Sequence, residues 1–86
     1  MPEICRFLGI IISMYYNEHA PPHFHAKYGE SRASFSIDEL KIIEGAMPKR
    51  IISLILEWAF EHRTELLEDW SLAQKHEELK KINPLV

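Results

Sequence analysis

Apolar and polar residues alternate most clearly in two neighbouring stretches of the chain, residues 23–28 and residues 32–37. This period of two is that of a β-strand, in which successive side chains point to opposite faces. The Gly-Glu-Ser sequence of residues 29–31 predicts a hairpin turn that pairs the two strands. The apolar face of this hairpin is then formed by Phe24, Ala26, Tyr28, Ala33, Phe35 and Ile37.

Further strands are predicted on both sides of the hairpin. Residues 4–16 are apolar, β-branched and aromatic, and they predict one long strand with a bulge or bend at Gly9. Residues 40–44 predict a fourth strand, which Gly45 ends. Residues 79–82 predict a short strand at the edge of the sheet.

One long helix is predicted after these strands. Pro48 suits the first turn of a helix, where its missing N–H group costs nothing. The helix is expected to run from residue 48 to residue 74 or 75, because no proline or glycine interrupts it. A break near Asp69 is the alternative, since residues 71–74 form a capping box. One apolar stripe of this helix contains Ile51, Ile55, Trp58, His62 and Leu66.

The expected architecture is therefore α+β. A small antiparallel sheet of about four strands, plus the short C-terminal edge strand, is packed on one face by the long C-terminal helix. With 86 residues, the chain is expected to form a single domain over residues 1–86.

Composition and charge narrow the classes of function. A net charge of −3 counts against a protein that binds nucleic acid over its whole surface, although a local basic patch stays compatible with it. The single cysteine, Cys5, cannot form an internal disulfide, which favours the cytoplasm. No segment contains the about 18–20 apolar residues that a membrane span requires, so no membrane association is expected.

The candidate chemistry lies on the polar face of the hairpin and in the loop before it. Histidine suits general acid–base catalysis near neutral pH, and a cation suits the phosphate of RNA. This combination predicts a ribonuclease-like hydrolase, with solvated polar residues that have no catalytic role as the alternative. The candidate catalytic residues are His19, His23, His25, Lys27 and Arg32.

The same histidines also support a second hypothesis, a metal site. His23 and His25 are two residues apart, so both rings leave one face of the strand. His19 from the proline-rich loop would add a third nitrogen ligand, and Glu30 is a further candidate. Zinc, copper or nickel suits such ligands, whereas the acid–base hypothesis requires no cofactor. His62 is interpreted as a structural residue of the helix stripe.

Four segments resemble one bacterial family, the domain of unknown function 4160. The most specific of them is Pro-Pro-His-Phe-His-Ala, residues 21–26, within residues 14–26. The others are residues 1–10, residues 58–70 and residues 79–85. The resemblance implies a bacterial cytoplasmic protein that acts as the toxin of a toxin–antitoxin pair, encoded beside a small antitoxin-like partner protein. It implies no particular catalytic residues.

Three hypotheses follow from the sequence. The first is a toxin whose histidine face acts on RNA or another target and is masked by its cognate partner. The second is a small metal-binding domain. The third is a non-catalytic module that binds a partner through an exposed face or edge of the sheet. A homodimer is compatible with each of them.

Overall fold

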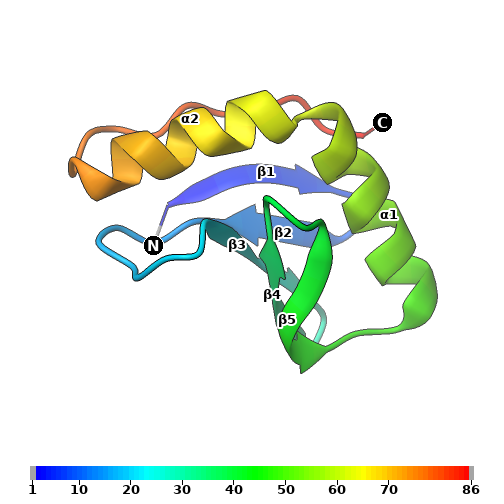
Figure 1. Ribbon diagram of the computed structural model, residues 1–86. Coiled ribbons are helices and arrows are strands. Elements are labelled where there is room, and N and C mark those ends of the chain that lie inside the picture. Colours follow the sequence, from blue (N-terminus) through cyan, green and yellow to red (C-terminus); the bar gives the residue numbers. More distant parts are fainter. Residues whose placement is uncertain (1, 86) are drawn as a thin grey trace.

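A five-stranded antiparallel sheet followed by two helices forms the computed structural model, which describes residues 2–85. The strands lie in the sheet in the order in which they occur in the chain, so each pairs with its sequence neighbours (Figure 1). This arrangement confirms the predicted α+β fold. The elements are β1 (Glu3–Phe7), β2 (Ile10–Ser13), β3 (His23–Tyr28), β4 (Ser31–Ser36), β5 (Lys41–Ala46), α1 (Lys49–Glu61) and α2 (Arg63–Gln74).

The first apolar stretch is a hairpin and not the single long strand that its composition predicts. Leu8 and Gly9 both have positive φ, 50° and 79°, and they form the turn between β1 and β2. Positive φ at both central residues is typical of the tight turn that suits the twist of paired strands. Phe7 and Ile10 are therefore direct partners. The sheet gains a strand because Gly9 reverses the chain where a bulge or bend was expected.

The central hairpin of β3 and β4 matches its predicted alternation. Phe24 pairs with Phe35, and His25 pairs with Ser34 on the opposite face. Both phenylalanine rings are fully buried and stacked, with their centroids 5.4 Å apart. The Phe24 ring also meets Trp58 of α1 in a T-shaped arrangement. The apolar face of the hairpin thus packs against the first helix, as predicted.

The helical region breaks at His62 and not near Asp69. His62 has φ −119° and ψ 25°, so it ends α1 and precedes α2. Its ring lies against Trp58 and its Nδ1 hydrogen-bonds the carboxylate of Glu65, which agrees with a structural role. Figure 1 shows α2 running along β1 while α1 turns away towards the other side of the molecule. Two shorter helices follow the twisted sheet better than one straight helix. Neither helix has the length and apolar composition that a membrane span requires.

The C-terminal segment returns along the first strand without forming the predicted edge strand. The N–H of Ile82 donates to the carbonyl oxygen of Ile4 over 2.9 Å, but the described residues of this segment form no further ladder bonds. The indole N–H of Trp58 donates to the carbonyl oxygen of Asn83. This segment therefore covers the edge of β1 and leaves β5, whose residues are mostly exposed, as the open edge.

Asp69 of α2 helps to hold this segment and is almost completely buried. Its Oδ1 accepts a hydrogen bond from the backbone N–H of Lys80, whereas its Oδ2 has no hydrogen-bond partner among the described residues. Burial raises the pKa of Asp69 above its ordinary value, and the Lys80 N–H only partly opposes this. The charged form of the carboxyl group is therefore disfavoured in the folded protein.

We expect Asp69→Asn to be at least as stable as the parent protein at pH 7. Because the pKa is raised on folding, the stability that the carboxyl group contributes is full below its unfolded pKa and is lost as the pH rises through its folded pKa. The amide can keep the bond to Lys80 but does not titrate. The variant's advantage in the free energy of unfolding should shrink as the pH falls towards about 4, the ordinary pKa of aspartate. Urea titrations between pH 4 and pH 8 measure this difference, and a parent advantage that grows with pH would contradict it.

Candidate functional site

The polar face of the sheet is built from two cross-strand rows. Direct pairing places Ser13 beside His25, His25 beside Ser34, and Ser34 beside Glu44. In the next row, Ile11 pairs with Lys27 and Lys27 with Arg32. Paired residues of an antiparallel sheet project to the same face. His25, Lys27 and Arg32 of the sequence prediction therefore lie together on one face.

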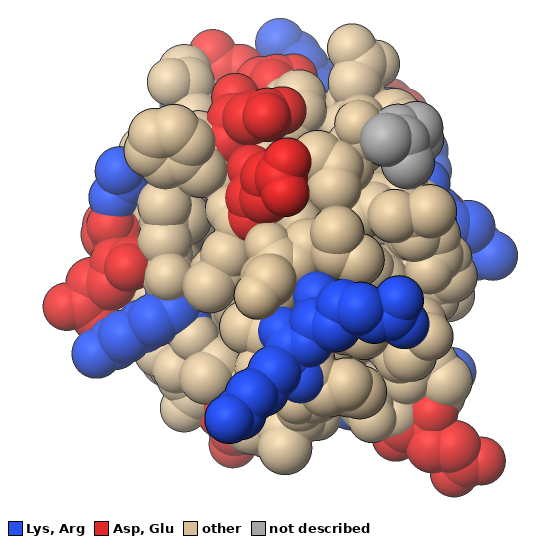
Figure 2. Space-filling view, turned by 90° about the vertical axis from the view of Figure 1, so that its right-hand side faces the viewer, with Lys and Arg blue, Asp and Glu red and all other residues tan. Residues whose placement is uncertain are grey.

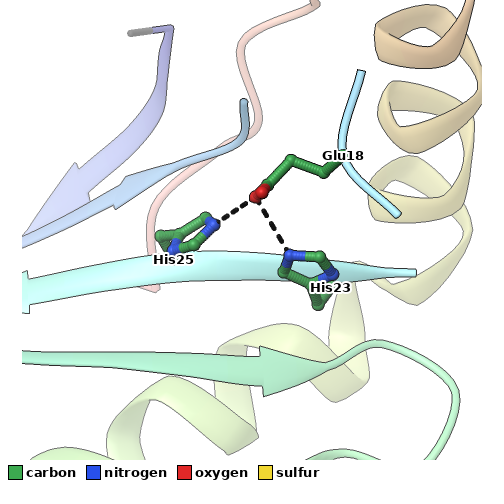
Figure 3. A group of neighbouring side chains, drawn as sticks. All are labelled: Glu18, His23 and His25. Atoms are coloured by element: carbon green, nitrogen blue, oxygen red, sulfur yellow. Dashed lines mark hydrogen bonds and ion pairs between the residues drawn. The ribbon is translucent and has the colours of Figure 1, made fainter. Parts of the chain in front are cut away.

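A carboxylate joins the two histidines of β3. Oε1 of Glu18 lies 2.6 Å from Nε2 of His25 and 3.0 Å from Nε2 of His23 (Figure 3). One oxygen thus contacts both rings, and one ligand atom from each of the three residues lies within 4.8 Å of the others. We call these three residues the Glu–His cluster.

The loop between β2 and β3 brings Glu18 to this position. Asn17 adopts a positive φ of 62° just before it, a conformation that asparagine accepts more readily than most residues. The side-chain amide of Gln74 donates to the backbone carbonyl of Glu18, so the end of α2 fixes the loop from the other side. Figure 1 shows this loop beside the C-terminal end of α2. Within the loop, the Ala20–Pro21 peptide bond is cis.

Aromatic rings pack around the Glu–His cluster. The centroid of the Tyr15 ring lies 4.2 Å from that of the His25 ring, and the centroid of the Trp70 ring lies 5.2 Å from that of the His23 ring. The side chains of His23 and His25 are 12% and 24% exposed, so the cluster is sheltered but open to solvent. Burial alone would raise the pKa of Glu18, but hydrogen bonds with His25 and His23 lower it below its ordinary value. The carboxylate is therefore held in its charged form.

A concavity of about 450 Å³ opens beside the cluster on the polar face of the sheet. This volume falls within the range of pockets that bind small ligands, roughly 300–1,000 Å³. Ser34, whose hydroxyl lies 3.2 Å from Nδ1 of His25, forms part of its floor. All five strands contribute to its lining, which includes Glu3, Arg6, Ser13, His25, Lys27, Arg32, Ser34, Glu44 and, just after β2, Tyr15.

The structure gathers some of the predicted site residues and separates others. His25, Lys27 and Arg32 line the concavity, and His23 adjoins it through the Glu–His cluster. His19 is exposed and is not one of the three residues whose ligand atoms converge. Glu30 is exposed in the turn after β3. Glu18 was not among the residues singled out from the sequence, and the only local signal is a carboxylate five residues before His23.

Fold and site together define a small α+β protein with a five-stranded antiparallel sheet and a Glu–His cluster at one end of its polar face. The family model of the domain of unknown function (DUF4160) matches residues 9–71, and the chain belongs to this family. The match includes the whole Glu–His cluster and the Pro-Pro-His-Phe-His-Ala segment. Comparison with curated proteins and with solved structures gave no match.

Proposed function

We propose that the polar face of the sheet acts on RNA, and that the protein is the toxin of a bacterial toxin–antitoxin pair. The toxin role follows from the resemblance of the sequence to its family. The action on RNA is supported by the residues of the concavity, and above all by one pair of cations, Lys27 and Arg32.

Lys27 and Arg32 are direct cross-strand partners on the floor of the concavity. Like charges placed directly opposite each other destabilise a sheet. Neither side chain forms an ion pair with any residue between positions 2 and 85. A phosphate group bound between them would offset this repulsion and would accept hydrogen bonds from both. The pair is therefore the feature of the concavity that supports binding of a phosphate ester.

His25 supplies the acid–base chemistry beside these cations. Its Nε2 meets the Glu18 carboxylate and its Nδ1 meets the Ser34 hydroxyl, so both ring nitrogens have hydrogen-bonding partners that orient the ring. With Nε2–H donating to Glu18, the lone pair is on Nδ1, and a ribose hydroxyl that replaces the Ser34 hydroxyl there can give its proton to the ring. The ring of Tyr15, which also lines the concavity, offers a surface on which a base can stack.

RNA contacts are expected to stay local to the concavity. The chain carries a net charge of −3, and Glu3 and Glu44 lie at opposite ends of its first polar row. Figure 2, which views the molecule from the right-hand side of Figure 1, shows small separate groups of basic and acidic side chains among uncharged residues. A short single-stranded segment fits this charge distribution better than a long duplex.

The open edge of β5 favours binding of a partner protein. Strand β5 is largely exposed and has no neighbour on its outer side among the described strands. Glu44 and Gly45 of this strand also line the concavity. A partner that adds a strand to this edge would lie beside the concavity and block it. Such a partner would act as the antitoxin, or as the target of a non-catalytic interaction module.

The test compares two matched pairs of cations. We expect the parent protein to arrest bacterial growth on inducible expression, and co-expression of the neighbouring gene to relieve the arrest. Lys27→Ala combined with Arg32→Ala should abolish the arrest and weaken binding of a short single-stranded RNA. It should also reduce the slope of log affinity against log salt by about 0.7, the value for one phosphate contact of a single strand, since both cations hold the same phosphate.

The matched control replaces Lys49 and Arg50, which are exposed at the start of α1, with alanine. This control should keep both growth arrest and RNA affinity. Normal growth with the parent protein would reject the toxin role. Equal loss of RNA affinity in both double variants would reject the concavity as the RNA site.

A further inference from the structure

The hydrogen-bond partners of His23 bear on what the Glu–His cluster can bind. Nδ1 of His23 lies 2.8 Å from the carbonyl oxygen of Pro21, which can only accept a hydrogen bond. In the neutral ring this bond places the proton on Nδ1 and leaves a lone pair on Nε2. That lone pair faces Oε1 of Glu18 at 3.0 Å, although the carboxylate has no proton to donate. In this tautomer two acceptors face each other, and either a metal ion between them or a second proton on the ring makes the contact favourable.

His25 is arranged to serve the same cation. Its Nε2 also faces Oε1 of Glu18, and its Nδ1 faces the hydroxyl of Ser34. A serine hydroxyl can donate or accept, so Nδ1–H of His25 can donate to Ser34 while Nε2 offers its lone pair. Both histidines thus have an oxygen partner for the nitrogen that points away from Glu18. Histidines that bind metals almost always donate their other ring N–H group in this way.

We propose that Glu18, His23 and His25 bind one divalent transition-metal ion of the zinc class. Two imidazole nitrogens and one carboxylate oxygen form a ligand set that suits zinc, and three protein ligands leave a position open for water. This inference goes beyond the proposed function and does not depend on it, because metal binding can be measured without RNA. The ligand set also differs from the three histidines that the sequence favoured, since Glu18 takes the place of His19.

The contacts between Glu18 and the two histidines are shorter than the spacing of ligands around a bound zinc ion. Metal–nitrogen distances of about 2.0–2.1 Å place the ligands of a tetrahedral zinc ion roughly 3.3 Å apart. The contacts of Glu18 Oε1 with His25 and His23, 2.6 and 3.0 Å, are shorter than this. Glu18 lies on a loop, whereas the histidines lie on β3 and pack against Tyr15 and Trp70. We therefore expect the Glu18 side chain to move outwards by a few tenths of an ångström when a metal binds.

The Glu–His cluster and the concavity share one residue, His25. This residue lies in the row next to Lys27 and Arg32. A water bound to a metal at the cluster would then be available to a substrate held in the concavity. In that arrangement His25 acts as a ligand, and the bound water takes over the role of the base.

Titration calorimetry of the metal-free protein with zinc chloride tests the proposal. We expect one ion per chain with a dissociation constant in the micromolar range or below. Glu18→Gln, His23→Ala and His25→Ala should each weaken binding by more than the roughly 10–100-fold that loss of an outer partner causes, and Ser34→Ala should weaken it by roughly 10-fold. Circular dichroism identifies any variant that fails to fold, and the visible spectrum of the parent protein with cobalt(II) reports the ligand geometry independently.

The matched control is His19→Ala, which removes an exposed histidine from the same loop. This variant should bind zinc as the parent does. A folded parent protein that binds no zinc at micromolar concentrations would overturn the proposal, and the proton on His23 would then be the cation between the two acceptors. A loss of affinity in His19→Ala as large as that in Glu18→Gln would overturn the ligand set. Zinc binding without any action on RNA would reject only the proposed function.

Discussion

Phe24→Ala is expected to lower the free energy of unfolding by about 3–5 kcal/mol, the usual cost of removing a buried aromatic ring. The ring is fully buried, stacked on Phe35 and in T-shaped contact with Trp58, so its loss leaves a cavity between the sheet and α1. A domain of this size has a total stability of only about 5–15 kcal/mol. Urea denaturation followed by tryptophan fluorescence measures the change.

Phe60→Ala is the matched control for this prediction, because the Phe60 side chain on α1 is 70% exposed. Its loss should change the free energy of unfolding by less than about 0.5 kcal/mol. Phe24 also lies between His23 and His25 in β3, so the same substitution should loosen the strand that carries the site. Similar losses for Phe24→Ala and Phe60→Ala would contradict the assignment of the apolar face.

Gly45→Ala is expected to cost roughly 2–5 kcal/mol, from about 1–2 for the left-handed backbone and about 1–3 for overpacking. Gly45 has φ 85°, and a Cβ there would lie 2.2 Å from the carbonyl oxygen of Arg32. The neighbouring Cα of Ala33 would be 2.9 Å away. These atoms belong to the backbone of β4, so relief requires β5 to move away from β4. Thermal and urea unfolding measure the loss.

Gly29→Ala separates the two contributions. Gly29 also has a positive φ, 59°, but an added Cβ there meets no atom within 4 Å. Its cost should therefore be limited to the roughly 1–2 kcal/mol of the left-handed conformation. Gly45 also lines the concavity, so under the proposed function Gly45→Ala should weaken RNA binding, whereas Gly29→Ala should leave it unchanged. Equal losses of stability in the two variants would contradict the close contact between Gly45 and the backbone of β4.

The failures of prediction from the sequence have local physical causes. The stretch from residue 4 to residue 16 is uniformly apolar, and Leu8 is an uncommon residue at a position with positive φ, so its turn carries a weak signal. The break at His62 contains no proline or glycine and arises where two helices follow a twisted sheet. The segment at residues 79–82 makes one ladder bond with β1 and no more.

The sequence could likewise place some residues of the candidate site but not all of them. His25, Lys27 and Arg32 could be placed on one face from the sequence, because the period of a strand and a short hairpin turn fix which side chains are neighbours. Glu18 could not be placed, because a loop residue has no fixed direction. Its position depends on Gln74, which reaches the loop from the end of α2.

The sequence by itself determined the β3–β4 hairpin, its polar and apolar faces, and the order of sheet and helix, because these depend on interactions between residues close in the chain. Only the tertiary structure decided that a carboxylate meets both histidines, that two cations share one concavity, and that β5 remains an open edge. These features depend on packing between distant segments, where the twist of the sheet and the direction of α2 set the distances between side chains.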